Sequence, residues 1–244
     1  MIRVDNLVKK FGDITAVAGV SFSVPEGQIF AFLGPNGAGK TTTIKMLTTM
    51  LRPTKGTVLI DGLDVTAEQH EVRRRFGIVF QDPSLDNGMT AYDNLNFHAV
   101  LYGLKRHGRR ARINELLQRF ELWDRRNDQV KTYSTGMRRR LEIARSLLHT
   151  PRILFLDEPS AGLDTQTRGY LWKQVKSLSQ NEGITVFLTT HYLEEAERVA
   201  DRVAIIDHGK IVAQGTTGDL KQMTGTPSLD DAFVVLTGSS MRDQ

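Results

Sequence analysis

Residues 34–41 read Gly-Pro-Asn-Gly-Ala-Gly-Lys-Thr and carry the most specific chemical signal in the chain. Glycines at such a turn let consecutive backbone N–H groups point at one anion, the lysine adds positive charge at the β- and γ-phosphates, and the threonine hydroxyl can ligate Mg²⁺. The pattern therefore predicts a nucleoside triphosphate site rather than an ordinary glycine-rich turn. The residues expected to bind the nucleotide are Gly34, Pro35, Asn36, Gly37, Ala38, Gly39, Lys40, Thr41 and Thr42.

A second signal lies downstream, where an apolar run at residues 153–156 leads directly into Asp157 and Glu158. In phosphate-loop enzymes an aspartate at this place holds Mg²⁺ through its water shell, and a neighbouring glutamate positions or deprotonates the attacking water. We therefore expect Asp157 to serve the metal and Glu158 to be the catalytic base. The alternative is that both acids only cap the next helix.

The elements that place these residues follow from the hydrophobic pattern. Short β-branched and aromatic runs alternate with helical patterns, which predicts an α/β fold with a mostly parallel sheet. Together with the phosphate loop, this is the arrangement expected of a P-loop NTPase core. Polar residues follow most of the core strands, as expected for ligands bound at the carboxyl ends of parallel strands. The core strands are expected at residues 28–33, 77–81, 153–157 and 185–189. An antiparallel β flank is expected from residues 2–8, 17–24 and 56–61.

The middle of the chain has a helical pattern, which predicts an inserted α-helical subdomain over about residues 82–150. Its best helix candidates are residues 92–102, 112–120 and 137–148. Further on, Asp207-His208-Gly209 has the turn chemistry of a β-hairpin between strands expected at residues 202–206 and 210–213. The domain is expected to span residues 1–237, followed by a polar tail at residues 238–244.

The composition is that of an ordinary globular protein, with 244 residues, 40% hydrophobic content and a formal net charge of +4. The absence of cysteine excludes disulfides, thiolate zinc sites and iron–sulfur ligation by this chain. Because no window approaches 18 uninterrupted apolar residues, we expect no membrane span and a cytoplasmic chain. Basic runs at residues 73–75, 105–112 and 138–140 are expected to be solvated, and the second could lie near anionic headgroups.

Together with three further motifs, the phosphate loop and the acidic pair resemble the nucleotide-binding domain of the ATP-binding cassette (ABC) family. The resemblance covers nearly the whole chain, and the motifs stand in the family's order. After the phosphate loop come Gln81, the signature segment at residues 133–137, Asp157 with Glu158, the segment at residues 160–164, and His191. The resemblance implies that the nucleotide is ATP, bound with Mg²⁺ and hydrolysed.

The resemblance also implies roles that the side-chain chemistry permits. The Gln81 amide would contact Mg²⁺ or the attacking water, and His191 would hydrogen-bond the γ-phosphate. Asp164 would belong to the loop that links one active site to the other. Phe11 occupies the place of the aromatic residue on which adenine stacks, and if that stack is the only base contact, GTP would be tolerated. The alternatives are a surface glutamine, a structural or capping histidine, and a plain core phenylalanine.

The signature segment Tyr-Ser-Thr-Gly-Met departs from the commonest form, Leu-Ser-Gly-Gly-Gln, but it keeps Ser134 and Gly136. A hydroxyl and a backbone N–H at the start of a helix would bind the γ-phosphate of ATP held by a partner. Ser134 alone could instead simply cap that helix. Because the chain has one phosphate loop and one signature, the resemblance implies that two copies close head to tail around two ATP molecules.

The departures themselves resemble the ABC-2-type branch of drug exporters. This implies the ATPase subunit of an exporter, held on the inner face of the membrane by a separate transmembrane permease. The permease is expected to dock on residues 82–102, where Pro83, Leu85, Met89 and Tyr92 look exposed. The alternatives are an importer ATPase, or a soluble ABC ATPase that acts on nucleic acid or ribosomes. Long coiled coils and a second cassette, which mark those relatives, are missing from the sequence, so no nucleic-acid partner is expected.

Overall fold

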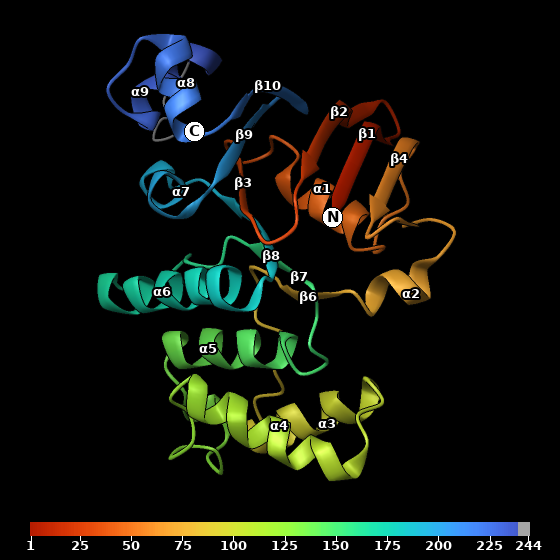
Figure 1. The fold of residues 1–244 in the computed structure, drawn as a ribbon, viewed down its shortest axis with the longest axis vertical. Coiled ribbons are helices and arrows are strands. Elements are labelled where there is room, and N and C mark those ends of the chain that lie inside the picture. The colour runs from red at the N-terminus through yellow and green to blue at the C-terminus, as the bar shows by residue number, and fades with distance from the viewer. Residues whose placement is uncertain (239–244) are drawn as a thin grey trace.

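The core of the protein is a six-stranded sheet in which five neighbouring strands run parallel (Figure 1). The structure is a computed structural model, and it describes residues 1–238. The central strands are buried along their whole length, as apolar runs covered on both faces should be. In spatial order the strands are β10 (Lys210–Gly215), β9 (Arg202–Asp207), β3 (Ile29–Leu33), β8 (Thr185–Thr190), β7 (Ile153–Asp157) and β6 (Phe76–Val79).

The expected parallel sheet is therefore confirmed, with one change at its edge. The strand predicted at residues 77–81 ends at Val79. Its last two carbonyls, those of Phe80 and Gln81, accept hydrogen bonds from the Arg139 side chain instead of from a neighbouring strand. This exchange turns the chain out of the sheet just before Gln81.

A second, antiparallel sheet flanks the first, as predicted, and contains one short strand, β5, beyond the three expected. Aromatic rings fill the space between the sheets: Phe22 stacks on Phe30 at 5.4 Å and lies 5.8 Å from Phe187. Such offset stacks stabilise beyond the area that they bury. The flanking strands are β2 (Ile14–Val24), β1 (Ile2–Phe11), β4 (Lys55–Ile60) and β5 (Leu63–Asp64).

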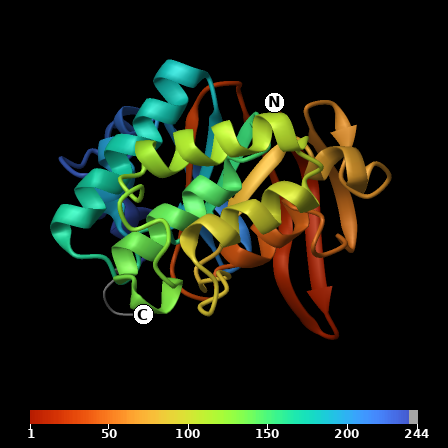
Figure 2. The same ribbon diagram turned by 90° about the horizontal axis from the view of Figure 1, so that it is seen from below.

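Helices cover one face of the main sheet in successive layers, which lie one below the other in Figure 1 and are seen from below in Figure 2. Leu154 and Leu188 of the sheet share one hydrophobic cluster with Leu171, Leu141 and Leu116 of three stacked helices. One helix, α1, packs on the opposite face with the aromatic rings. The layers are α6 (Thr165–Glu182), α5 (Thr135–Ser146), α4 (Arg106–Arg119) and α3 (Ala91–Leu101), and α1 spans Lys40–Leu47. A short 3₁₀ turn, η1 (Val130–Thr132), precedes α5.

Helix α4 begins earlier than the sequence predicts, at Arg106 rather than at residue 112. Arginine is a good helix former, so the basic run continues the helix although it lacks an apolar face. The helical stretch between β6 and β7 agrees in place with the predicted subdomain, whose bounds at residues 82 and 150 stay a prediction.

The C-terminal part completes the fold with the expected hairpin and several short helices. His208 and Gly209 form the turn between β9 and β10 with φ of 43° and 76°. The short helices that the sequence analysis did not predict are α2 (Gln69–Arg73), α7 (Leu193–Val199), α8 (Thr217–Thr224) and α9 (Leu229–Thr237), and the short elements β5 and η1 were not predicted either. The predicted tail lies, except for Gly238, outside the described residues. Within residues 1–238, no helix is long and apolar enough to cross a bilayer.

Candidate nucleotide-binding site

The phosphate loop connects β3 to α1 and depends on glycine at positions where a side chain would not fit. A Cβ at Gly34 would collide with the Ile206 carbonyl, and one at Gly39 would lie 2.5 Å from the Ala16 carbonyl. Gly39 also has φ of 105°, which L side chains rarely adopt. The loop borders a hollow of about 150 Å³, lined by Ala16, Pro35, Asn36, Gly37, Gly39, Lys40, Thr41, Thr42, Gln81 and Glu158.

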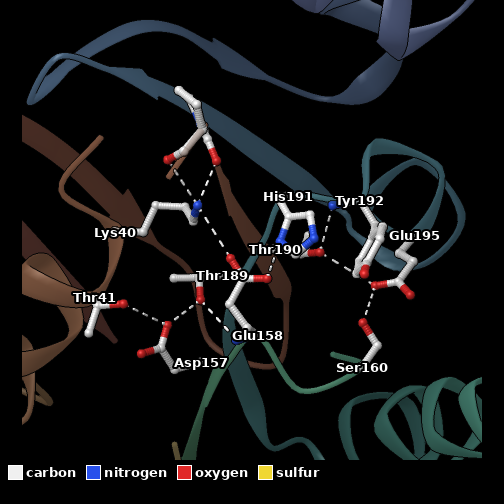
Figure 3. Close-up of polar contacts among 12 residues, drawn as sticks. Lys40, Thr41, Asp157, Glu158, Ser160, Thr189, Thr190, His191, Tyr192 and Glu195 are labelled. Carbon is white, nitrogen blue, oxygen red and sulfur yellow. Dashed lines mark hydrogen bonds and ion pairs between the residues drawn. The ribbon is translucent and has the colours of Figure 1, made fainter. Parts of the chain in front are cut away.

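Lys40 is 6% exposed, and its ammonium group is held over its own loop. Nζ donates hydrogen bonds to the carbonyls of Gly34 at 2.6 Å and Pro35 at 3.1 Å, and it lies 3.3 Å from Glu158 Oε1. A buried cation needs such partners, since desolvation disfavours an isolated charge. Lys40 also lines the hollow, and Figure 3 shows its ammonium group reaching toward Glu158.

Asp157 ends β7 and brings a carboxylate to the threonine of the phosphate loop. Its Oδ1 accepts hydrogen bonds from Thr189 at 2.6 Å and from Thr41 at 3.4 Å. Burial raises the pKa of Asp157, and the two hydroxyl donors oppose that shift. Carboxylate and hydroxyl oxygens are the hard ligands that Mg²⁺ prefers, so Thr41 and Asp157 fit the metal role expected of them.

Glu158 lies between Lys40 of the phosphate loop and His191, and its carboxylate contacts both. It is 5% exposed, and its φ of 50° lies in the left-handed region, which is strained for a residue with a side chain. Its backbone N–H donates to Thr189 Oγ1 at 3.1 Å, and its Oε2 lies 2.6 Å from His191 Nδ1. Lys40 therefore contacts one carboxylate oxygen and His191 the other (Figure 3).

Gln81 is exposed and lines the same hollow, and its backbone is held by a residue that the sequence analysis misjudged. Arg139 belongs to a basic run that was expected to be solvated, but it is only 6% exposed. It donates to the carbonyls of Phe80 at 2.6 Å and Gln81 at 3.1 Å and pairs with Glu142 at 3.0 Å. The expectation is wrong for this residue because the inner face of α5 turns it toward the loop after β6.

Two further charged side chains of α5 bind the same loop. Glu142 accepts from the Ser84 backbone N–H at 2.9 Å, and Arg145 donates to the Ser84 carbonyl at 2.7 Å. Burial raises the pKa of Glu142 and lowers the pKa of Arg139 and Arg145. The spacing of these residues by three along one helix was the only sequence signal, and it is common on exposed helices too.

The signature residues do not line the hollow of their own chain. Ser134 caps α5, because its hydroxyl accepts from the Met137 backbone N–H at 3.2 Å. A Cβ at Gly136 would lie 2.5 Å from Thr167 Cγ2. Asp164 caps α6 and accepts from the Thr167 backbone N–H at 2.9 Å. Capping is therefore one function of Ser134 and Asp164, and nucleotide contact by Ser134, Gly136 and Asp164 stays a prediction.

Phe11 lies at the end of β1 and is 49% exposed, with the Lys9 ammonium 5.0 Å from its ring centre. It is therefore no core aromatic, which was the alternative for this residue. It does not line the hollow at the phosphate loop, whereas Ala16 of the next strand does. Adenine stacking on Phe11 stays a prediction.

In the predicted docking segment, residues 82–102, only some of the side chains that were expected to be exposed are exposed. Pro83 is exposed, but Leu85 and Tyr92 pack against the helical core, and Met89 is half-buried. The exposed apolar side chains lie further along α3 and just beyond its end: Phe97, Val100, Leu101 and Tyr102. Helix α3 presents them because its other face, with Leu95 and Ala99, is buried.

Comparisons with known proteins find one family profile and many similar chains. The sequence profile described as ABC transporter matches residues 17–161. The chain is 48% identical to the daunorubicin/doxorubicin resistance ATP-binding protein DrrA of Streptomyces peucetius, over 92% of this chain and 68% of the relative. It is 43% identical to the Nod factor export ATP-binding protein I of Ralstonia nicotianae, over 90% and 68%. A dimeric ATP-binding cassette solved in a post-hydrolysis state with ADP and phosphate is similar at 28% identity with a TM-score of 0.80, over 88% and 98%.

Proposed function

The chain belongs to the ABC transporter family and is an ATPase, and from this premise we propose that it drives export through a separate permease on the inner face of the membrane. The observation that carries the proposal is the position of the Glu158 carboxylate between Lys40 and His191, beside the phosphate loop, where it is placed for ATP hydrolysis. Similar proteins named for drug resistance and for Nod factor export support the direction of transport.

In the proposed reaction each side chain acts from the place where it lies. Lys40 would turn its ammonium group from its own loop carbonyls to the β- and γ-phosphates. Glu158 would position the attacking water and accept its proton. His191, which contacts the Glu158 carboxylate at 2.6 Å, would hold that carboxylate and hydrogen-bond the γ-phosphate. The buried setting strengthens these interactions, because little water competes with them.

Magnesium, when bound, would neutralise charge on the β- and γ-phosphates. Thr41, Asp157 and Gln81 are the residues that would hold it. Two of them are already joined by a hydrogen bond, and Gln81 lines the same hollow. Because the Gln81 backbone is bound to Arg139 of α5, its position depends on the helical layer.

The second half of each site would come from a second copy of the chain. Ser134 and Gly136 lie at the start of α5 and do not line the hollow at their own phosphate loop, so in this proposal they face the nucleotide of the other copy. A helix start with a hydroxyl is suited to a γ-phosphate. The similarity to a dimeric cassette with ADP and phosphate supports this head-to-tail assembly.

The predicted docking segment at residues 82–102 exposes large apolar side chains only near the end of α3, so we place the permease at that end and on the adjoining basic hollow. This hollow is a cavity of about 640 Å³ between the α3–α4 loop and the turn that connects α5 to β7. Arg74, Lys105, Arg109 and Arg112 line it, with no acidic residue, and Tyr102 continues it into the exposed face of α3. Such a surface fits a cytoplasmic helix with an apolar face and a carboxylate. In the reconstituted transporter, Arg74→Glu with Arg109→Glu should abolish transport and spare the ATPase of the isolated chain. Normal transport would exclude docking here.

The experiment that tests the function is ATPase activity of the purified chain at increasing protein concentration, with Glu158→Gln beside it. We expect turnover to rise more steeply than concentration, because two copies complete each site. Glu158→Gln should keep ATP binding, form an ATP-dependent dimer and lose turnover by about 10²–10⁴-fold. Parental turnover in Glu158→Gln would remove the base from its role, and linear turnover from a monomer would exclude the two-copy site.

A further inference from the structure

A single buried carboxylate, Glu195 of α7, connects the two loops that carry the proposed catalytic residues. It is 6% exposed, and its Oε2 accepts a hydrogen bond from Ser160 Oγ at 2.6 Å. Thr190 Oγ1 lies 3.4 Å from the same oxygen. Figure 3 shows Ser160 and Thr190 approaching Glu195 from two different segments.

The two hydroxyl groups belong to residues that lie close in the chain to Glu158 and His191. Ser160 lies two residues after Glu158, in the loop that leaves β7, and Thr190 directly precedes His191 at the end of β8. The Thr190 hydroxyl also accepts from the Tyr192 backbone N–H at 2.9 Å. The Glu195 carboxylate therefore holds both chain segments on which the 2.6 Å contact between Glu158 and His191 depends.

The other carboxylate oxygen reaches the same histidine by a second route. Arg168 Nε lies 3.2 Å from Glu195 Oε1, and the Arg168 guanidinium lies 5.0 Å from the centre of the Tyr192 ring. The Tyr192 ring in turn packs on the His191 ring, with 4.0 Å between their centres. Glu195 is thus connected to His191 through Thr190 on one side and through Arg168 and Tyr192 on the other.

A buried carboxylate is a poor way to gain stability. Burial raises the pKa of Glu195, and hydrogen bonds and the Arg168 charge only oppose that effect. Buried ionic groups can often be replaced by apolar residues without loss of stability, so the value of such a group lies in the geometry that it imposes.

We propose that Glu195 is a positioning residue, which fixes His191 against Glu158 and so acts on the hydrolysis step and not on ATP binding. This inference rests on the proposed function, because it requires Glu158 and His191 to take part in hydrolysis.

The test compares Glu195→Gln with Glu194→Gln, an exposed neighbour on the same helix. Glu195→Gln removes the carboxylate charge and one of its two acceptor oxygens, so the remaining hydrogen bond is weaker. We expect kcat to fall about tenfold while KM and ATP affinity stay within about twofold. Ser160→Ala removes the shorter bond from the other side and should lower kcat in the same way. It keeps the proposal testable if Glu195→Gln fails to fold. Parental kcat in both variants, or an equal loss of ATP affinity, would overturn the proposal.

A second measurement separates positioning from a general structural role. In a His191→Ala background, Glu195→Gln should cause little further loss of kcat, since the residue on which it acts is gone. The same fold-loss in both backgrounds would contradict the inference. The outcome is distinct from failure of the proposed function: an inactive Glu158→Gln beside a fully active Glu195→Gln would overturn only the role of Glu195.

Discussion

Two clusters of buried charged residues lie at or next to this site, and they differ in the hydrogen-bond partners of their cationic side chains. At the phosphate loop, Lys40 donates to carbonyls of its own loop and to Glu158, beside a hollow. In the α5 cluster, Arg139 and Arg145 donate to carbonyls of the loop after β6, and Glu142 binds its backbone N–H. A phosphate group could replace the partners of Lys40, whereas the partners of the α5 cluster are backbone groups of the protein and are not available to a ligand.

The difference indicates that the Lys40 cluster binds the nucleotide and that the α5 cluster holds two segments of the fold together. A cation whose partners can be exchanged is suited to binding and chemistry, as are groups gathered at a cavity. A cation bonded to backbone carbonyls and a buried acid instead ties one segment to another. Removing one partner of such a pair leaves a buried charge without compensation, which costs about 3–5 kcal/mol. The α5 cluster should therefore act through stability and position, and the Lys40 cluster through the nucleotide.

The largest effects are expected when one cation is removed from each cluster and the two variants are compared in ATP affinity and in stability. Lys40→Ala should weaken ATP binding about 10–100-fold, from the loss of charged hydrogen bonds. It should lower stability less than Arg139→Met, because His191 still contacts Glu158. Arg139→Met should lower the free energy of unfolding by about 3–5 kcal/mol and change ATP affinity little. Equilibrium ATP binding and urea unfolding measure the two quantities.

Matched substitutions separate burial from charge. Lys45→Ala on α1 and Arg138→Met on α5 remove more exposed cations from the same helices and should change either quantity little. The double variant Arg139→Met with Glu142→Leu removes both charges of the pair and should be less destabilised than Arg139→Met alone. Equal effects of Lys40→Ala and Arg139→Met on both quantities would remove the distinction between the clusters.

The sequence predicts the Lys40 cluster well, because its members lie at strand ends or in one short motif. The strands of Asp157 and Glu158 and of His191 are neighbours in a parallel sheet, so their carboxyl ends meet at the same edge. Gln81 follows the next strand beyond β7. The antiparallel flank was also predictable, since its strands are long and apolar residues recur along them.

The α5 cluster could not be predicted in the same way. The run at residues 138–140 contains three arginines, and only the helix orientation decides which of them points inward. Glu195 depends on contacts with segments about 5 and 35 residues away, which no local pattern encodes. Helices α8 and α9 are short, and they depend on the caps at Thr216 and Ser228 more than on apolar periodicity.

The smallest expected effect concerns the pH dependence of stability at His98, a histidine near Arg145 of the α5 cluster. Burial, and then the Arg145 charge, lower the pKa of His98 on α3 from 6.5 to about 4. The unfolded chain therefore binds a proton at His98 before the folded protein does. This contribution to stability is fully present above pH 6.5 and is lost as the pH falls from 6.5 toward about 4. Urea unfolding of His98→Gln should depend less on pH across that window than the parent, whereas exposed His107→Gln should match the parent. If His98→Gln keeps the parental slope, neither burial nor the Arg145 charge lowers the pKa of His98 in the folded protein.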